Sequence, residues 1–345
     1  MSAKFVNLLL GHGLSPFTGE VMFNNTAYTS HYDKHIRPFV QDFENERIKA
    51  LIACRKRSLT SIFICAILLL YFIPFFVRVT SDPDGTGFII GMTVFICICF
   101  GNWSHRPLKN YKSSVKQNVY PNIFSFFGED FKYCENDTLT KDSISIDSLQ
   151  PSGLIPSHNR SSTEDFVSGY YKGVKLELFE AELIRKSKDS KGRDTSSTVF
   201  KGIFIRLNMN KSFNCKTIVK RDQGKIGNWF GDKFSKLETV RLEDPIFEKM
   251  FQIYSDDQVE ARYLLTTSFM QRLINLTEVF GSKNIQCSFY NNQLLFMIST
   301  SHNRFETASA FKPATFETEI NTILNEMDEI FQIIDTLKLD EQTGL

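Results

Sequence analysis

The sequence predicts an α+β protein: a two-helix transmembrane hairpin with a cytoplasmic helical stalk, plus a cytoplasmic antiparallel sheet domain packed with helices. Three observations carry this prediction. Residues 59–77 and 85–103 are two blocks of 19 residues without Asp, Glu, Lys, Arg or His. Strand-like segments rich in Val, Ile, Leu and Phe alternate with turn residues over 173–221. A regular amphipathic helix is predicted over 316–337.

The two apolar blocks have the length of membrane-spanning helices. A helix of 19 residues is roughly 28 Å long, and the hydrocarbon core of a bilayer is about 30 Å thick. A soluble core helix of that length would normally carry a polar stripe, whereas both blocks are apolar all round. Pro83 and Gly85 lie at the connection, where the chain must reverse direction. We therefore expect membrane helices at about 59–77 and 85–103.

Basic residues flank the outer ends of both blocks. Arg55, Lys56 and Arg57 precede the first block, and Arg106 follows the second, next to Trp103 at the expected interface with the headgroups. The short connection carries one arginine beside two aspartates. The positive-inside rule therefore predicts that both termini are cytoplasmic. The basic side chains would lie near anionic headgroups, but setting the topology is a sufficient role for them.

Composition excludes several other classes of protein. The chain has 40 Lys and Arg against 39 Asp and Glu, so no overall field favours nucleic acid as a partner. Its seven cysteines include no CxxC pair, which argues against a disulfide framework and against a structural zinc site. Phosphate-binding loops of the P-loop and GxGxxG types are absent, as are GxSxG and HExxH motifs. We expect no cofactor.

The chain divides into five predicted parts. They are an N-terminal segment (1–30), the stalk with the transmembrane hairpin (31–134), a Ser-, Asp- and Asn-rich linker (135–165), an α+β domain (166–338) and a tail (339–345). Residues before and after the apolar blocks show helical spacing, which predicts that the membrane helices continue into the cytoplasm as a pair.

The predicted α+β domain is built from neighbouring strands and three helices. Strands are expected within 173–186, 198–209 and 213–221, and a hairpin with Asn291 and Asn292 at its turn. Helices are expected within 244–252, 267–281 and 316–337. The last helix has two interpretations: packing across the sheet of its own domain, or a coiled-coil or dimer contact. Its apolar stripe is wider than a coiled-coil seam needs, which favours the first.

A family resemblance supports this architecture. The segment FEKMFQIYSDDQVEARYLLT, with SGLIPSHNRSSTEDFVSGYYKGVKLELFEAEL and TVFKGIFIRLNMNKSF, resembles the bacterial membrane family catalogued as domain of unknown function 3137. The resemblance runs from about residue 30 to residue 335. It implies a bacterial inner-membrane protein with a cytoplasmic α+β domain, and it brings no activity or catalytic residues.

The strongest chemical candidate is an acidic cluster in SDDQVEARY. Asp256 and Glu260 would share a face of a helix, and together with Asp257 could hold a cation or act as general acid and base, with Arg262 nearby. Alternatively, the same residues start a helix, because a capping Asp and first-turn acids stabilise free backbone N–H groups and the helix dipole. The helix-start interpretation needs fewer assumptions, so no catalytic residue is assigned.

A second cluster, HYDKH, offers ligand-type side chains. His31 and His35 are four residues apart around Asp33, a spacing that two metal ligands can use on a helix. His12 is the one further candidate ligand, and a solvated helix start explains the segment equally well. We predict no metal site there.

Aromatic and basic residues interleave in KIGNWFGDKFSK. Trp229, Phe230 and Phe234 could dip into the inner leaflet or hold a lipid headgroup. A loop that lines the core is the commoner reason for such aromatics.

The functional hypothesis is a non-enzymatic binding or scaffold module, anchored in the bacterial inner membrane with both termini cytoplasmic. Its partners would be the lipid bilayer and a second copy of the chain or another membrane protein, not nucleic acid. One alternative is a membrane-anchored, metal-assisted hydrolase that uses Asp256, Asp257 and Glu260. Another is a lipid-sensing domain.

Overall fold

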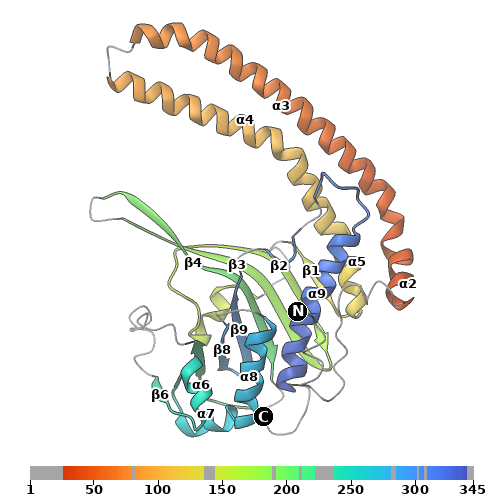
Figure 1. The fold of residues 1–345 in the computed structure, drawn as a ribbon, viewed down its shortest axis with the longest axis vertical. Coiled ribbons are helices and arrows are strands. Elements are labelled where there is room, and N and C mark those ends of the chain that lie inside the picture. The colour runs from red at the N-terminus through yellow and green to blue at the C-terminus, as the bar shows by residue number, and fades with distance from the viewer. Residues whose placement is uncertain are drawn as a thin grey trace, which may run out of the picture.

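The computed structural model describes residues 26–79, 83–135, 144–188, 192–209, 212–221, 237–280, 285–300, 303–306 and 309–339. Its main body is an antiparallel sheet with helices against it, and two long helices project from this body as a hairpin (Figure 1). The predicted α+β class and antiparallel sheet are confirmed.

Nine strands form the sheet within the described residues, in the order β1-β2-β3-β4-β9-β8-β5-β7-β6. Their bounds are β1 Lys132–Cys134, β2 Arg160–Tyr171, β3 Val174–Lys188, β4 Asp194–Asn208, β5 Thr217–Arg221, β6 Glu238–Val240, β7 Phe251–Ser255, β8 Ile285–Tyr290 and β9 Gln293–Ser299. Every pair of neighbouring strands is antiparallel. The predicted turn between β8 and β9 is present, with φ of 48° at Asn291 and 59° at Asn292, values that asparagine tolerates well.

Eight α-helices accompany the sheet in the described part of the chain. Their bounds are α2 Thr26–His35, α3 Arg37–Val79, α4 Pro83–Asn118, α5 Tyr120–Phe124, α6 Pro245–Met250, α7 Gln258–Leu264, α8 Thr267–Val279 and α9 Glu317–Leu337. Short 3-10 helices occupy Ser125–Phe127 and Asp147–Ser152. Asp244 caps α6 and accepts the N–H groups of Ile246 and Phe247, as the sequence predicts.

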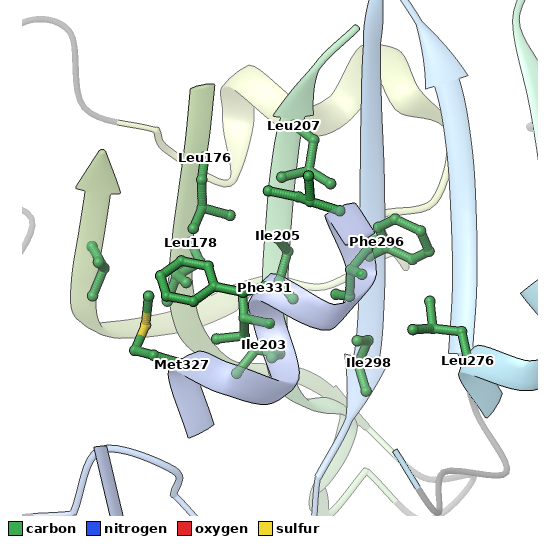
Figure 2. Packing of buried hydrophobic residues seen from close by; sticks show 14 of the residues in the cluster. Leu176, Leu178, Ile203, Ile205, Leu207, Leu276, Phe296, Ile298, Met327 and Phe331 are labelled. Carbon is green, nitrogen blue, oxygen red and sulfur yellow. The ribbon is translucent and has the colours of Figure 1, made fainter. Parts of the chain in front are cut away.

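The last helix packs across the sheet of its own domain. Met327 and Phe331 of α9 lie against Leu178 and Ile203, which face it from β3 and β4 (Figure 2). Ile320, with the further apolar residues of its stripe, is also buried. The coiled-coil interpretation is therefore wrong for this face, because the fold already covers it.

The segment expected to be a linker forms part of a second core. Ile146, Leu149 and Ile155 are buried in a cluster that includes Phe179 and Phe204. Phe179 on β3 and Phe204 on β4 are opposite each other in the strand pairing, and both side chains point to the face of the sheet away from α9. Residues 144–155 therefore cover the other face of the sheet. The polar composition of this segment hid the few apolar side chains that anchor it.

The stalk and the apolar blocks are continuous helices, as expected. Helix α3 has 43 residues and α4 has 36, and they run side by side (Figure 1). Near the sheet, Phe43, Tyr111 and Val115 are buried, whereas Ile48 and Ile52 are exposed. The two helices thus cover each other's apolar stripe in part.

The structure does not support the transmembrane part of the predicted fold. Among the described residues, no helix reaches both the length and the apolarity required to span a bilayer.

Candidate functional site

The acidic cluster predicted from the sequence is bound to backbone N–H groups. Asp257 caps α7, with its Oδ1 accepting from Val259 N at 2.8 Å and Glu260 N at 3.0 Å. Asp256 Oδ1 accepts from the N–H of Lys216 at 2.7 Å. Glu260 Oε2 accepts from Cys215 N at 2.7 Å.

This geometry agrees with the helix-start interpretation. Asp256 and Glu260 fix α7 against the segment that leads into β5, and Asp257 caps the helix. Arg262 donates to the carbonyl of Gln258 at 3.3 Å. Within the described residues, no three His, Cys, Asp or Glu side chains are grouped so as to hold a metal ion. The geometry thus accounts for these side chains by local structure.

The His31–His35 pair lies in α2. The two rings stack with centroids 4.6 Å apart, His31 Nε2 is 2.8 Å from the carbonyl oxygen of Asn122, and Asp33 pairs with Arg37 at 2.9 Å. His31 is therefore engaged with the backbone at α5. His12 lies outside the described residues.

The structure describes the residues predicted at the membrane interface, but not the candidate lipid contacts. The Arg57 guanidinium lies over the Trp103 ring, 5.1 Å from its centroid, and Arg57 Nη1 donates to the Trp103 carbonyl at 3.3 Å. Arg55, Lys56 and Arg106 are exposed on the same stretch of the paired helices. The candidate lipid contacts Trp229, Phe230 and Phe234 lie outside the described residues.

A site that the sequence did not predict joins the hairpin to the sheet; we call it the junction. Its centre is an ion pair between Lys116 of α4 and Asp165 of β2. Lys116 Nζ lies 2.7 Å from each Asp165 carboxylate oxygen, and the Tyr133 hydroxyl of β1 also donates to that carboxylate. The Asp165 side chain is fully buried and that of Lys116 is 9% exposed. An ion pair so deeply buried is costly to form unless its geometry is good.

The backbone at Asp165 is adapted to this contact. Asp165 has φ of 56°, a left-handed conformation that is uncommon outside glycine, and it lies in a bulge of β2 between Glu164 and Val167. Its N–H donates to the carbonyl of Glu135 at 3.1 Å. The bulge lets a strand residue turn its carboxylate toward α4.

The junction continues through Glu180 of β3 and Arg304. Glu180 Oε1 accepts from Arg304 N at 2.6 Å and Phe305 N at 3.0 Å, and Arg304 Nη1 pairs with Glu329 of α9 at 2.6 Å. Burial raises the pKa of Glu180, and the Phe305 N–H acts against this. The loop before α9 is thus attached to β3 through a carboxylate. Beside it, Glu180 lines a pocket together with two other carboxylates and Lys201.

Glu326 of α9 is the group in this region with a carboxylate oxygen left unbonded. It is 9% exposed, and its Oε2 has no hydrogen-bond partner within the described residues. Burial raises its pKa from 4.5 to about 9, with Arg304 acting against this and Glu180 acting with it. Glu326 is therefore protonated at neutral pH. Burial also raises the pKa of Asp165, which the charge of Lys116 opposes.

A second attachment connects α3 to the loop before α9. Glu44 pairs with Arg47 at 2.5 Å, and its Oε2 accepts from Ala314 N at 2.8 Å. Arg47 Nη1 donates to the Ala310 carbonyl at 2.9 Å. Arg47 and the Ala314 N–H lower the pKa of Glu44 to about 2. The sheet domain therefore holds α4 through the buried Lys116–Asp165 ion pair, and α3 through hydrogen bonds between the Glu44–Arg47 pair and the backbone before α9.

These features define a class of protein: an antiparallel α+β sheet domain from which a long helical hairpin projects, fixed by charged contacts at its base. Residues 198–339 match the model of a family described as "Protein of unknown function (DUF3137)". The match runs from within β4 to just past the end of α9, and it confirms over those residues the resemblance expected from the sequence.

Other comparisons add no functional evidence. The crystal structure of the mycobacterial trehalose monomycolate transport factor A, TtfA, is similar with a TM-score of 0.32 and 11% sequence identity, over 62% of this chain and 91% of that chain. No curated protein matches the chain significantly.

Proposed function

We propose that this chain is an integral inner-membrane protein whose α3–α4 hairpin crosses the bilayer twice. Its sheet domain would then be a cytoplasmic, non-enzymatic binding or scaffold module. One observation carries the proposal: the distal halves of α3 and α4 expose large apolar side chains that the sheet domain does not cover.

The exposure is high and lies on both helices. Phe63 is 68% and Leu70 is 71% exposed on α3, and Phe95 is 66% and Ile98 56% exposed on α4. Moving one such side chain from water into hydrocarbon is worth about 1.5–3 kcal/mol. Contiguous exposed apolar surface of this kind marks a contact with membrane or protein. Because it lies within uncharged blocks of 19 residues, a bilayer is the fitting partner.

The polar groups at the start of the first block support the same conclusion. Thr60 and Ser61 donate to the Arg57 carbonyl at 2.9 Å and 2.7 Å, and Ser58 bonds to Ser104 across the helix pair at 2.5 Å. Hydroxyl groups that are satisfied inside the helix pair lower the cost of entering a bilayer.

The assignment of a binding module rests on how the domain uses its charges. The acidic side chains at the start of α7 and just before it accept hydrogen bonds from backbone N–H groups, and the junction fastens the hairpin to the sheet. Both sets of contacts hold one element of the fold in position against another. A domain fastened in this way to a membrane anchor is suited to present a surface to a partner.

Alkaline carbonate extraction of membranes tests the anchor. The full chain should stay in the membrane pellet. Leu70→Lys with Phe95→Lys places one charge near the middle of each block, at a cost of about 2.5–3.5 kcal/mol per residue, and should release part of the protein. The matched control is Val259→Lys with Phe311→Lys, at apolar side chains that are each 78% exposed on the sheet domain. This control should behave as the unmodified chain does.

Complete extraction of the unmodified chain would overturn the proposal. Reporters fused to either end, active only in the cytoplasm, test the orientation: both fusions should be active, and an inactive one would contradict the topology.

A further inference from the structure

We propose that a collar of basic side chains at the base of the apolar blocks binds anionic phospholipid headgroups. The collar is Arg55, Lys56, Arg57, Arg106 and Lys109. The inference rests on the proposed membrane anchor and adds a specific class of lipid partner to it.

The first step is the distribution of charge along the paired helices. No Asp or Glu occurs between Glu46 and Asp82, or between Asp84 and Glu129. The collar therefore lies in a stretch of two helices that contains cations and no carboxylates. Like charges repel one another within a Debye length of about 8 Å, so this stretch favours an external anionic partner.

The second step is a contrast with the cations closer to the sheet. Three of those cations have a counter-charge within the protein: Arg37 pairs with Asp33, Arg47 with Glu44, and Lys116 with Asp165. By contrast, no collar residue has a carboxylate within ion-pair distance among the described residues. Along the described helices, ion pairs within the protein thus occur near the sheet and not next to the apolar blocks.

The third step is the geometry at Arg57 and Trp103. The Trp103 ring holds the Arg57 guanidinium by a cation–π contact at 5.1 Å, and one guanidinium N–H donates to the Trp103 carbonyl. A guanidinium carries five N–H donors, so several remain for phosphate oxygens. Trp103 is 43% exposed, as an indole at a headgroup boundary would be. Arg55, Lys56, Arg106 and Lys109 are exposed around this pair.

Quenching of Trp103 fluorescence by brominated lipids tests the collar directly. The chain has two tryptophans, so a Trp229→Phe background leaves Trp103 as the sole reporter. The full-length protein is placed in nanodiscs of phosphatidylcholine that contain increasing fractions of brominated phosphatidylglycerol or of brominated phosphatidylcholine. Both faces of a nanodisc are accessible, so the orientation of the hairpin does not affect the result.

Each basic residue near an anionic membrane surface contributes about a fivefold preference. Phosphatidylglycerol should therefore occupy the site at Trp103 at least about tenfold more favourably than phosphatidylcholine, the preference that two such residues would already exceed. The variant R55Q/K56Q/R106Q/K109Q should lose this preference while both lipids still quench. The control K188Q/K201Q/K249Q/K312Q removes the same number of exposed charges from the sheet domain and should keep it. High salt should weaken the preference of the unmodified chain.

Each outcome separates the two proposals. Equal quenching by both lipids in the unmodified chain overturns the collar and leaves the anchor intact. Equal loss in the two quadruple variants also overturns the collar, because the effect would then be one of net charge. Absence of quenching by either lipid overturns both proposals.

Discussion

Lys116 on the hairpin and Asp165 on the sheet are 49 residues apart in the sequence and form the buried ion pair that joins these two parts. Both contacts measure 2.7 Å, and the Tyr133 hydroxyl donates to the same carboxylate. In a low-dielectric interior such a pair is sensitive to the loss of one partner, because the remaining charge is left without compensation.

Removing one partner should therefore cost more than removing both. Lys116→Met should lower the free energy of unfolding of the sheet domain by about 3–5 kcal/mol, because Asp165 stays buried without its cation. The double variant Lys116→Met with Asp165→Leu should be less destabilised than that single variant. Urea unfolding of the full chain in mild detergent measures both.

Lys109→Met is the matched control, since Lys109 is exposed on the same helix. It should leave the free energy of unfolding within about 0.5 kcal/mol of the unmodified value. If Lys116→Met were equally mild, the junction would not be an energetic connection between hairpin and sheet.

Glu326 predicts a stability that falls as the pH rises. Its pKa is about 9 in the folded protein because it is buried, against 4.5 when it is exposed. Between these two values the folded state holds a proton that the unfolded state releases. Stability from this group is therefore present below about pH 4.5 and is lost progressively toward pH 9, by up to about 1.4 kcal/mol per pH unit.

Glu326→Gln should remove this dependence, because the amide is neutral at every pH and similar in shape. We expect the variant to be more stable than the unmodified chain at pH 8, by about 1–3 kcal/mol. Glu317→Gln, at an exposed position on the same helix, should keep the original pH profile. Unfolding curves of the two variants and of the unmodified chain, measured from pH 5 to pH 8, test this prediction. If Glu326→Gln and Glu317→Gln showed the same dependence of stability on pH, Glu326 would not be buried and protonated.

Gly202 permits the close approach of β4 to β9. A Cβ built at this position would lie 2.1 Å from the Ile298 carbonyl oxygen, a backbone atom that cannot move aside cheaply. Gly202→Ala should therefore lower the free energy of unfolding by more than about 2 kcal/mol. Gly173→Ala is the comparison, because Gly173 has φ of 80° with no atom within 4 Å of the added Cβ. It should cost about 1 kcal/mol, from backbone conformation alone. Equal losses in the two variants would show that steric contact at Gly202 is not decisive.

The parts of the fold that were predicted correctly have strong local signals. Asp244 before Pro245 marks the start of α6, and Asn291 with Asn292 marks the β8–β9 turn, because each residue acts on its own neighbours. The single-sided stripe of α9 likewise predicts its burial against the sheet. In contrast, the polar run that begins β2 gave no strand signal, because its first residues are exposed.

The junction could not be predicted for a different reason. Lys116 follows the other basic residues of the stalk and looks like one more of them. Asp165 stands at the end of a polar segment that also looked solvent-exposed. The burial of both follows from the bulge in β2 and from the path of α4, which are set by contacts far apart in the sequence. The one local signal would have been a basic residue amid the apolar positions Tyr111, Val115 and Val119.

Asp257 separates the two interpretations of the acidic cluster. As the cap of α7 it accepts two N–H groups through a single oxygen, Oδ1, a role that asparagine can also fill. Asp257→Asn should therefore keep the free energy of unfolding within about 0.5 kcal/mol, whereas Asp257→Ala should lower it by about 1 kcal/mol. A cation site predicts otherwise, since asparagine removes the charge that would hold the metal. Calorimetric titration with Mg²⁺ and Mn²⁺ supplies the second measurement: we expect no binding that depends on Asp257. Cation binding that Asp257→Asn abolishes without loss of stability would instead favour the hydrolase hypothesis for Asp256, Asp257 and Glu260.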